Sequence, residues 1–260
     1  MTRVAAHRLQ TNFSRAAEAY DARAVFQHVQ TRRVLDAALM LLPERATLVD
    51  IGCGTGFFAA CAAAKRPQWR IYGLDIAAGM CRVAQPRCQP IQGNACTLPF
   101  ANASVDAAVS TLCYQWVEEP RAAYAELARV LKAGGTAIVA SLGEQSLQEL
   151  RGLAQDVSAP LRLLTLRSHA ETLADMRAAG FNVLLADART QTEHYPSVRA
   201  LLDSMRSIGA GHNFMPTTSA VSRLSPTRWA ALLAAYEELR TSAGIPATWE
   251  HHFFVLHKPL

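Results

Sequence analysis

Three glycines at alternate positions form the stretch of this sequence that most clearly indicates chemistry. Gly52, Gly54 and Gly56 follow a short apolar run that ends at Ile51, and an alanine-rich helical pattern begins directly after them. A buried strand that turns tightly into a helix has this pattern. Glycine is needed where the backbone takes positive φ or where a ligand comes closer than a Cβ allows. The stretch therefore predicts a ligand held against main chain.

The spacing of the glycines argues against a dinucleotide ligand and an NAD-linked dehydrogenase. A dinucleotide-binding turn has the form G-x-G-x-x-G, and Phe57 stands where its third glycine would fall. The form D-x-G-x-G-x-G resembles the first motif of class I S-adenosylmethionine-dependent methyltransferases, in which Asp50 would face the cationic methionine end of the cofactor. A glycine-rich turn of another α/β protein is the alternative. The residues that the motif assigns to the cofactor are Asp50, Gly52, Cys53, Gly54 and Gly56.

A second carboxylate ends the next strand-like run, 70–75. Asp75 lies about twenty residues beyond the glycines. In nucleotide-binding folds an acidic residue at this distance accepts hydrogen bonds from the ribose hydroxyl groups. Two vicinal hydroxyls match the two oxygens of one carboxylate. We expect Asp75 to bind the ribose and the adjacent Ile76 to contact the cofactor; an N-cap for a helix over 76–84 is a compatible alternative.

A third strand is predicted over 88–92. In class I methyltransferases the loop that follows this strand holds the adenine. Asn94 stands where that family usually has an Asp, and its amide oxygen can accept the same hydrogen bond without the charge. Ala95 would offer its backbone N–H to a ring nitrogen. A fourth strand, 105–111, ends at Thr111, a further cofactor contact, and the segment 112–120 follows it as a candidate substrate wall.

These motifs need a sheet whose strands end at one edge. Helices are predicted over 5–20 and 23–42, before the first strand, and over 121–131 before a fifth strand, 136–142. The remaining elements are predicted as helices at 146–154, 169–179, 198–208 and 226–242, strands at 181–186 and 249–257, and a loop at 209–216. We expect an α/β fold: a Rossmann-like, mostly parallel, seven-stranded doubly wound sheet with N-terminal helices and a helical lid insertion.

The whole chain of 260 residues is expected to form one domain. Its predicted parts are an N-terminal helical cap (1–42), a cofactor-binding half (43–143), a helical lid with strand six (144–225), and a C-terminal helix with the last strand (226–260).

Composition narrows the class of protein further. The formal charge of +5 comes without a run of Lys and Arg, so the charge does not imply a nucleic-acid partner. An acidic protein partner is equally compatible with it. No stretch is long and apolar enough to cross a bilayer, and the first residues lack a secretory signal, so we expect a cytoplasmic protein without a membrane partner. The six cysteines form no C-x-x-C pair, which favours free thiols and no metal.

Nearly the whole chain resembles one family, the BioC-type malonyl-[acyl-carrier protein] O-methyltransferases, which open biotin synthesis. The glycine turn is shared by all class I methyltransferases, whereas Gln115-Trp116 and the loop 208–210 are more particular. The stretch 156–167 departs from the family's lid sequence. The other matching pieces are Phe13–Ala17 with Tyr20 and Gln27, Leu74-Asp75, Leu98-Pro99, Arg129–Leu131, Ser146–Leu150, Met205–Ala210 and Thr248–Phe253.

The resemblance implies methyl transfer from S-adenosylmethionine to the free carboxylate of a malonyl thioester on acyl carrier protein, or on coenzyme A. Tyr20 would cover the transfer site, and Gln115 and Trp116 would line it. A carboxylate is already deprotonated at neutral pH, so catalysis would be positioning. Cations that could hold the acceptor are Arg151 and Arg206, favoured from a pool with Arg162, Arg167, His169 and His212. An acidic carrier also predicts a basic patch, for which Arg162, Arg167 and Arg206 are candidates.

Three other functions stay open at this point. One is a small-molecule methyltransferase that acts on another free carboxylic acid, such as aconitate, and needs no carrier. Another methylates a quinone-type ring carbon, for which His169 or His212 would serve as base. The third is a non-catalytic subunit that binds the cofactor and regulates a partner, which the intact glycines and Asp75 disfavour.

Overall fold

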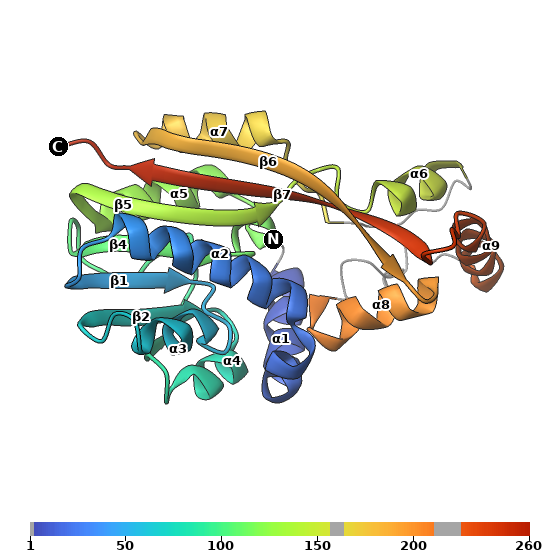
Figure 1. Ribbon diagram of the computed structural model, residues 1–260, viewed down its shortest axis with the longest axis horizontal. Coiled ribbons are helices and arrows are strands. Elements are labelled where there is room, and N and C mark those ends of the chain that lie inside the picture. Colours follow the sequence, from blue (N-terminus) through green and yellow to red (C-terminus); the bar gives the residue numbers. More distant parts are fainter. Residues whose placement is uncertain (1–2, 157–163, 211–224) are drawn as a thin grey trace.

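A seven-stranded sheet organises the protein (Figure 1). The structure, a computed structural model, describes residues 3–156, 164–210 and 225–260. The strand order is β3-β2-β1-β4-β5-β7-β6; β1 to β5 pair in parallel, and β7 runs antiparallel to both of its neighbours. The expected mostly parallel, doubly wound α/β sheet is confirmed. The strands are β1 (Ala46–Ile51), β2 (Trp69–Asp75), β3 (Gln89–Gln92), β4 (Val105–Thr111), β5 (Leu131–Leu142), β6 (Asn182–Tyr195) and β7 (Ile245–His257).

Helices cover both faces of the sheet. One face packs against α2 (Val25–Leu41) and α3 (Phe57–Ala63), and the other against α5 (Pro120–Val130) and α7 (His169–Ala178). Because both faces are covered, the central strands are apolar almost throughout, as β1 shows with five buried residues of six. Two further helices pack against each other: α1 (Arg3–Arg23) and α4 (Ala78–Ala84).

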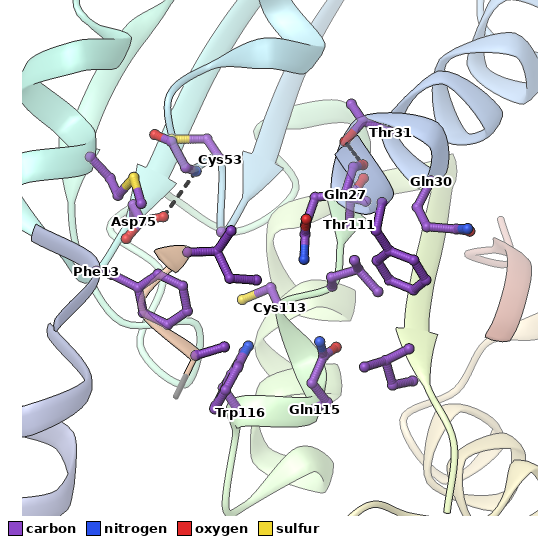
Figure 2. A pocket seen from close by; sticks show the side chains of 18 of the residues that line it. Phe13, Gln27, Gln30, Thr31, Cys53, Asp75, Thr111, Cys113, Gln115 and Trp116 are labelled. Carbon is purple, nitrogen blue, oxygen red and sulfur yellow. Dashed lines mark hydrogen bonds between the residues drawn. The ribbon is translucent and has the colours of Figure 1, made fainter. Parts of the chain in front are cut away.

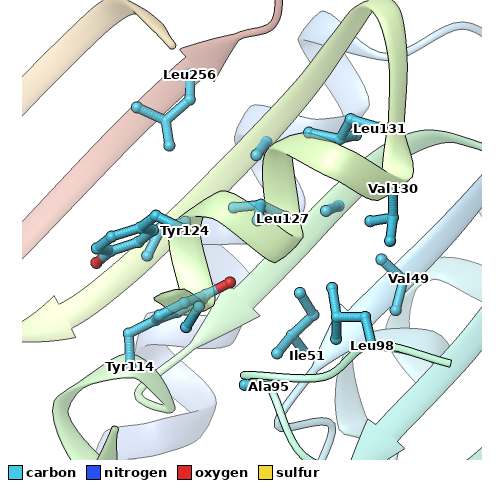
Figure 3. Packing of buried hydrophobic residues seen from close by; sticks show 14 of the residues in the cluster. Val49, Ile51, Ala95, Leu98, Tyr114, Tyr124, Leu127, Val130, Leu131 and Leu256 are labelled. Atoms are coloured by element: carbon cyan, nitrogen blue, oxygen red, sulfur yellow. The ribbon is translucent and has the colours of Figure 1, made fainter. Parts of the chain in front are cut away.

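The packing of α5 illustrates how the sequence forms these layers (Figure 3). Pro120 stands in the first turn of the helix, where its missing N–H costs nothing. Leu127 and Val130, one turn apart, lie over Val49 and Ile51 of β1 in one buried cluster. The helix therefore fixes the strand that leads into the glycine turn.

The antiparallel pair of strands β6 and β7 extends past the rest of the sheet (Figure 1). Residues 251–257 of β7 pair with both β5 and β6, whereas 245–250 pair with β6 and extend beyond the end of β5. Three helices pack around the projecting part: α6 (Gln148–Asp156), α8 (Val198–Ser207) and α9 (Pro226–Glu237). They share a separate apolar cluster, here called the outboard cluster. Its buried side chains include Leu147, Leu150, Leu201, Leu202, Leu232, Tyr236 and Trp249.

Three predicted bounds are wrong in this outboard region. The strand predicted at 249–257 begins at Ile245. The strand predicted at 181–186 runs to Tyr195, because its polar second half is an exposed edge strand held by pairing with β7 rather than by a buried face. The helix predicted over 226–242 ends at Glu237. Most of the loop predicted at 209–216 lies outside the described residues. None of the helices in the described part of the chain is long and apolar enough to cross a membrane.

Candidate functional site

One cavity of about 820 Å³ opens at the carboxyl ends of β1, β2, β4 and β5 (Figure 2). This is the edge at which open α/β sheets bind ligands, because the connections there are free to form a crevice. The predicted site residues that line it are Tyr20, Asp50, Gly52, Cys53, Gly54, Asp75, Ile76, Asn94, Ala95, Thr111, Gln115 and Trp116. Gly56, Arg151 and Arg206 are predicted site residues that do not.

The three glycines serve different purposes. All have positive φ, between +54° and +79°. A Cβ on Gly52 would lie 2.4 Å from the Cβ of Cys113, so that glycine allows two loops of the protein to meet. Gly56 backs onto Ala84, away from the cavity. Gly54 has nothing within 4 Å of its missing Cβ. Of the three, Gly54 is the one where a ligand can approach the main chain.

Main-chain hydrogen bonds tie the glycine turn to the end of β2. The amides of Gly52 and Cys53 donate to the Leu74 carbonyl at 2.7 and 3.0 Å. The Gly54 amide donates to Oδ2 of Asp75 at 2.9 Å, and the Ala77 amide donates to Oδ1 at 2.8 Å. Each carboxylate oxygen has two lone pairs, so both can still accept from a ligand hydroxyl. This places a fixed pair of acceptors beside Gly54.

One buried carboxyl, one half-buried carboxyl and a phenol give this part of the cavity its electrostatic character. Burial raises the pKa of Asp50, which is 3% exposed, and also that of Asp75. Burial and the neighbouring carboxyls of Asp75 and Asp21 raise the pKa of Tyr20, so its hydroxyl stays neutral and able to donate. A cation that enters here would restore the charged form of the carboxyls. The site therefore favours a positively charged ligand.

The predicted adenine loop lies at the same end of the cavity. Asn94 is exposed, and its Oδ1 accepts from the Cys96 amide at 2.9 Å, which fixes the turn. A second lone pair of that oxygen remains for a ligand amine. Ala95 is buried beside it. Their roles toward the adenine stay predictions.

A side-chain network that the sequence analysis did not find closes the N-terminal helices onto the glycine turn. Asp21 accepts from Oγ1 of Thr55 at 2.5 Å and from Arg87 at 2.7 Å. These hydrogen bonds lower the pKa of Asp21, although burial acts in the opposite direction. The His28 ring stacks on Phe57, with centroids 3.6 Å apart. The partners are 34 and 66 residues from Asp21, so no local pattern could have revealed them.

Amide and aromatic side chains line the middle of the cavity (Figure 2). Gln27 of α2 and Gln115 of the 3-10 turn Tyr114–Trp116 lie on opposite walls. Oε1 of Gln115 is buried without a partner in the described residues. Trp116 packs edge-on against Phe13, with the ring centroids 5.6 Å apart. A ligand here would meet neutral hydrogen-bonding groups on an apolar wall.

The predicted acceptor arginines lie outside this lining. Arg151 donates to the carbonyls of Ser146 and Leu164 at 3.1 and 2.8 Å, so it supports two lining segments from behind. Arg206 pairs with Asp203 at 2.9 Å. Their contact with an acceptor stays a prediction.

The other members of the cation pool divide into two groups. His169 stacks on Phe254 and Arg167 pairs with Asp175, and neither lines the cavity. Arg162 and His212 lie outside the described residues. Among the described lining residues, Arg23 and His28 are the ones that can carry positive charge, and burial lowers the pKa of His28.

The far wall comes from the outboard region and was not predicted as part of the site. Tyr195 of β6, Trp249 of β7 and Met205 of α8 line it together. The Tyr195 hydroxyl donates to Glu193 at 2.8 Å. No group of three or more ligand-type side chains in the described residues is arranged to hold a metal ion.

The lining fits S-adenosylmethionine, the cofactor implied by the motif. Asp75 would hold the ribose diol, Asp50 would face the ammonium, and Gly54 leaves room beside the main chain. The middle and far wall remain for an acceptor. We therefore expect the cofactor at the glycine turn, here called the cofactor half, and the acceptor between Gln27, Gln115 and the far wall, here called the acceptor half.

Comparison with known proteins supports this assignment. Residues 49–139 match the family model described as "Methyltransferase domain". Similar solved structures show the same fold: the YcgJ protein of Bacillus subtilis (TM-score 0.63, 18% identity, 88% of this chain and 99% of that chain) and the [4+2]-cyclase SpnF (TM-score 0.57, 22% identity, 88% and 81%). Because one of these is named as a cyclase, the fold alone does not fix the reaction.

Curated relatives are similar over nearly the whole chain. A malonyl-[acyl-carrier protein] O-methyltransferase of Gallionella capsiferriformans is 35% identical over 92% of this chain and 86% of its own length. One of Herminiimonas arsenicoxydans is 33% identical over 97% and 96%. The biotin biosynthesis bifunctional protein BioHC of Cellvibrio japonicus is 34% identical over 99% of this chain, which spans 51% of that protein. The chain belongs to the malonyl-[acyl-carrier protein] O-methyltransferase family.

Proposed function

We propose that this protein transfers the methyl group of S-adenosylmethionine to the free carboxylate of a malonyl group on acyl carrier protein, which gives a methyl ester for biotin biosynthesis. The named activity of the full-length relatives supports the reaction. The observation that carries it here is a cavity in which a cation-favouring cofactor half adjoins an acceptor half lined by neutral hydrogen-bonding side chains.

The chemistry asks for positioning rather than a base. A malonyl carboxylate is ionised at neutral pH, so no proton has to be removed. One of its oxygens forms the new bond to the methyl carbon while the carbon–sulfur bond breaks, and that electron pair stays on sulfur. Negative and positive charge are both consumed in this displacement. The protein has to align the two reactants and keep water out.

Neutral donors suit a step that consumes charge. A close arginine would stabilise the acceptor carboxylate more before the reaction than in the transition state, where its charge is partly lost, and would slow the transfer. Amides of Gln27 and Gln115 and the hydroxyl of Tyr20 can orient the carboxylate without that cost. A half-turn of the Gln115 amide exchanges its oxygen for its nitrogen and brings a donor to the buried, unpartnered position. We assign Tyr20, Gln27 and Gln115 to the acceptor and Trp116 to the wall beside it.

The test is transfer of labelled methyl to a panel of acceptors: malonyl-acyl carrier protein, malonyl-coenzyme A, free malonate and aconitate. We expect label on the malonyl carrier protein and its release by base as volatile labelled methanol, which hydrolysis of a methyl ester gives and cleavage of the thioester alone does not. Label on free malonate or aconitate alone would instead make the protein a small-molecule methyltransferase. Cofactor binding with no labelled acceptor would favour the regulatory role.

A further inference from the structure

Exposed side chains show where the cavity opens. On the α1–α2 side the lining residues Arg23, Val25 and Val29 are exposed, the two valines by 69% and 57%. At the adenine loop the exposed lining residues are Asn94, Glu118 and Glu119. Gln191 of β6 and Ser204 of α8 are also exposed lining residues, at the far wall, and neither carries a charge. The cavity therefore opens at a helical mouth, at an adenine mouth and beside the uncharged part of the far wall.

The two mouths carry opposite charge. Beside the helical mouth, Arg32 is exposed one turn beyond Val29, with its guanidinium 5.3 Å from the Phe57 ring centre. Asp187, the acid on the neighbouring edge strand, is already paired with Arg33 at 2.7 Å and Arg189 at 2.9 Å. Asp36 is also exposed on α2, one turn beyond Arg32. The four arginines Arg23, Arg32, Arg33 and Arg189 outnumber the acids Asp36 and Asp187, so positive charge is in excess here.

The adenine mouth is acidic. Glu118 and Glu119 are both exposed there. After burial, the Glu119 carboxylate is the largest cause of the raised pKa of Cys96, so this acid faces the loop that contains Asn94. An acidic protein would be repelled from this opening.

We infer that an acidic carrier protein docks at the helical mouth, on the docking face formed by Arg23, Val25, Val29 and Arg32. This rests on the proposed function, because it names the surface that receives the carrier. Val25, Val29 and Arg32 are spaced to share one side of α2. The arginines attract the acidic carrier, and the exposed valines give an apolar centre for the contact. The carrier-bound arm then enters toward Gln27, two residues from Val25 on the same helix.

The patch predicted from sequence stays a prediction, and we favour the docking face over it. Arg167 is paired with Asp175 and Arg206 with Asp203, and Arg162 lies outside the described residues. The docking face instead adjoins the cavity directly, through three of its four residues.

The experiment compares a carrier-bound and a carrier-free acceptor. The Arg23→Glu/Arg32→Glu double variant and the Val29→Glu variant are assayed with malonyl-acyl carrier protein and with malonyl-pantetheine, which lacks the acidic protein. Arg70→Glu is the matched control, because Arg70 is exposed on β2 beyond the opposite end of the sheet. We expect each docking-face variant to raise KM for the carrier substrate about tenfold or more, with kcat little changed. KM for malonyl-pantetheine should stay within about twofold in the Arg32→Glu single variant, because Arg32 does not line the cavity.

The salt dependence supplies a second readout. Added salt should raise KM for the carrier in the wild type and much less in the double variant, because the screened charges are gone. An unchanged KM for the carrier in both docking-face variants, or an equal rise with Arg70→Glu, would overturn the inference. A wild type that methylates neither thioester would overturn the proposed function itself. Normal cofactor binding by each variant shows that it has folded.

Discussion

The cofactor half of the cavity is built mainly from backbone, whereas the acceptor half is built from side chains. The glycine turn and the Asp75 carboxylate are fixed by amides from two neighbouring strand ends. The acceptor half is lined by Gln27 of helix α2, Gln115 of a short turn and Trp249 of the projecting strand β7. Backbone geometry suits one cofactor shared by many enzymes. Side chains on separately packed elements allow the acceptor to differ while the cofactor half stays the same.

The largest expected effect lies in the cofactor half. Asp75→Asn removes the charge that receives a diol and weakens one of two amide contacts, and hydrogen bonds to charged groups contribute about 1.5–3 kcal/mol each. We expect S-adenosylmethionine to bind about 100-fold more weakly in a calorimetric titration. Asp36→Asn, on the exposed side of α2, is the control and should bind normally. Unaltered binding by the Asp75 variant would remove the ribose assignment.

A change in the acceptor half should separate turnover from cofactor binding. Gln115→Leu keeps the approximate size of the side chain but removes its amide from the cavity wall. We expect kcat to fall about 10- to 100-fold, the range for lost alignment, while the dissociation constant of S-adenosylmethionine stays the same. Gln68→Leu, exposed before β2, serves as the matched control. Loss of cofactor affinity together with kcat would mean that Gln115 belongs to the other half.

The network at Asp21 joins the N-terminal helices to the cofactor half, so its loss should have a smaller effect. Asp21→Asn weakens the hydrogen bonds to Thr55 and Arg87. We expect cofactor affinity to fall about tenfold. Combined with Thr55→Val, the loss should be less than the sum of the two single losses, because both act on one contact. Full additivity would show that the two side chains act separately.

The smallest expected effect is a pH dependence that only the cofactor half should show. Burial raises the pKa of Asp50 and Asp75 in the free protein, and an ammonium ligand favours their ionised forms. Binding therefore releases protons, and the affinity for S-adenosylmethionine should fall as pH drops from about 7.5 to about 5.5. Asp50→Asn should flatten this profile. An affinity that rises toward low pH would contradict the assignment.

The same division explains what could be predicted from the sequence. Strands β1, β2, β4 and β5 contain apolar runs, and Asp50, Gly54 and Asp75 occupy fixed places relative to β1 and β2. Local pattern therefore located the cofactor half. The second half of β6 is polar and depends on its partner β7, so its length was missed. The division of the chain at 42, 143 and 225 stays a prediction.

Contacts between distant segments account for the rest of the site. The Asp21 network spans residues far apart in the chain, and Tyr195 and Trp249 reach the cavity only because strands β6 and β7 project beyond the rest of the sheet. Arg151 has the right chemistry for a carboxylate, but its guanidinium is used by backbone carbonyls. Residue type alone cannot show which partner an arginine finds.

Amide hydrogen exchange with the two ligands added in turn tests the division most directly. S-adenosylhomocysteine alone should protect amides in 50–57, 75–77 and 93–96 and leave 191–195 unchanged. Malonyl-pantetheine added to that complex should then protect 112–117 and 191–195. Protection of both halves by the first ligand, or of the cofactor segments alone by the second, would contradict a cavity divided between cofactor and acceptor.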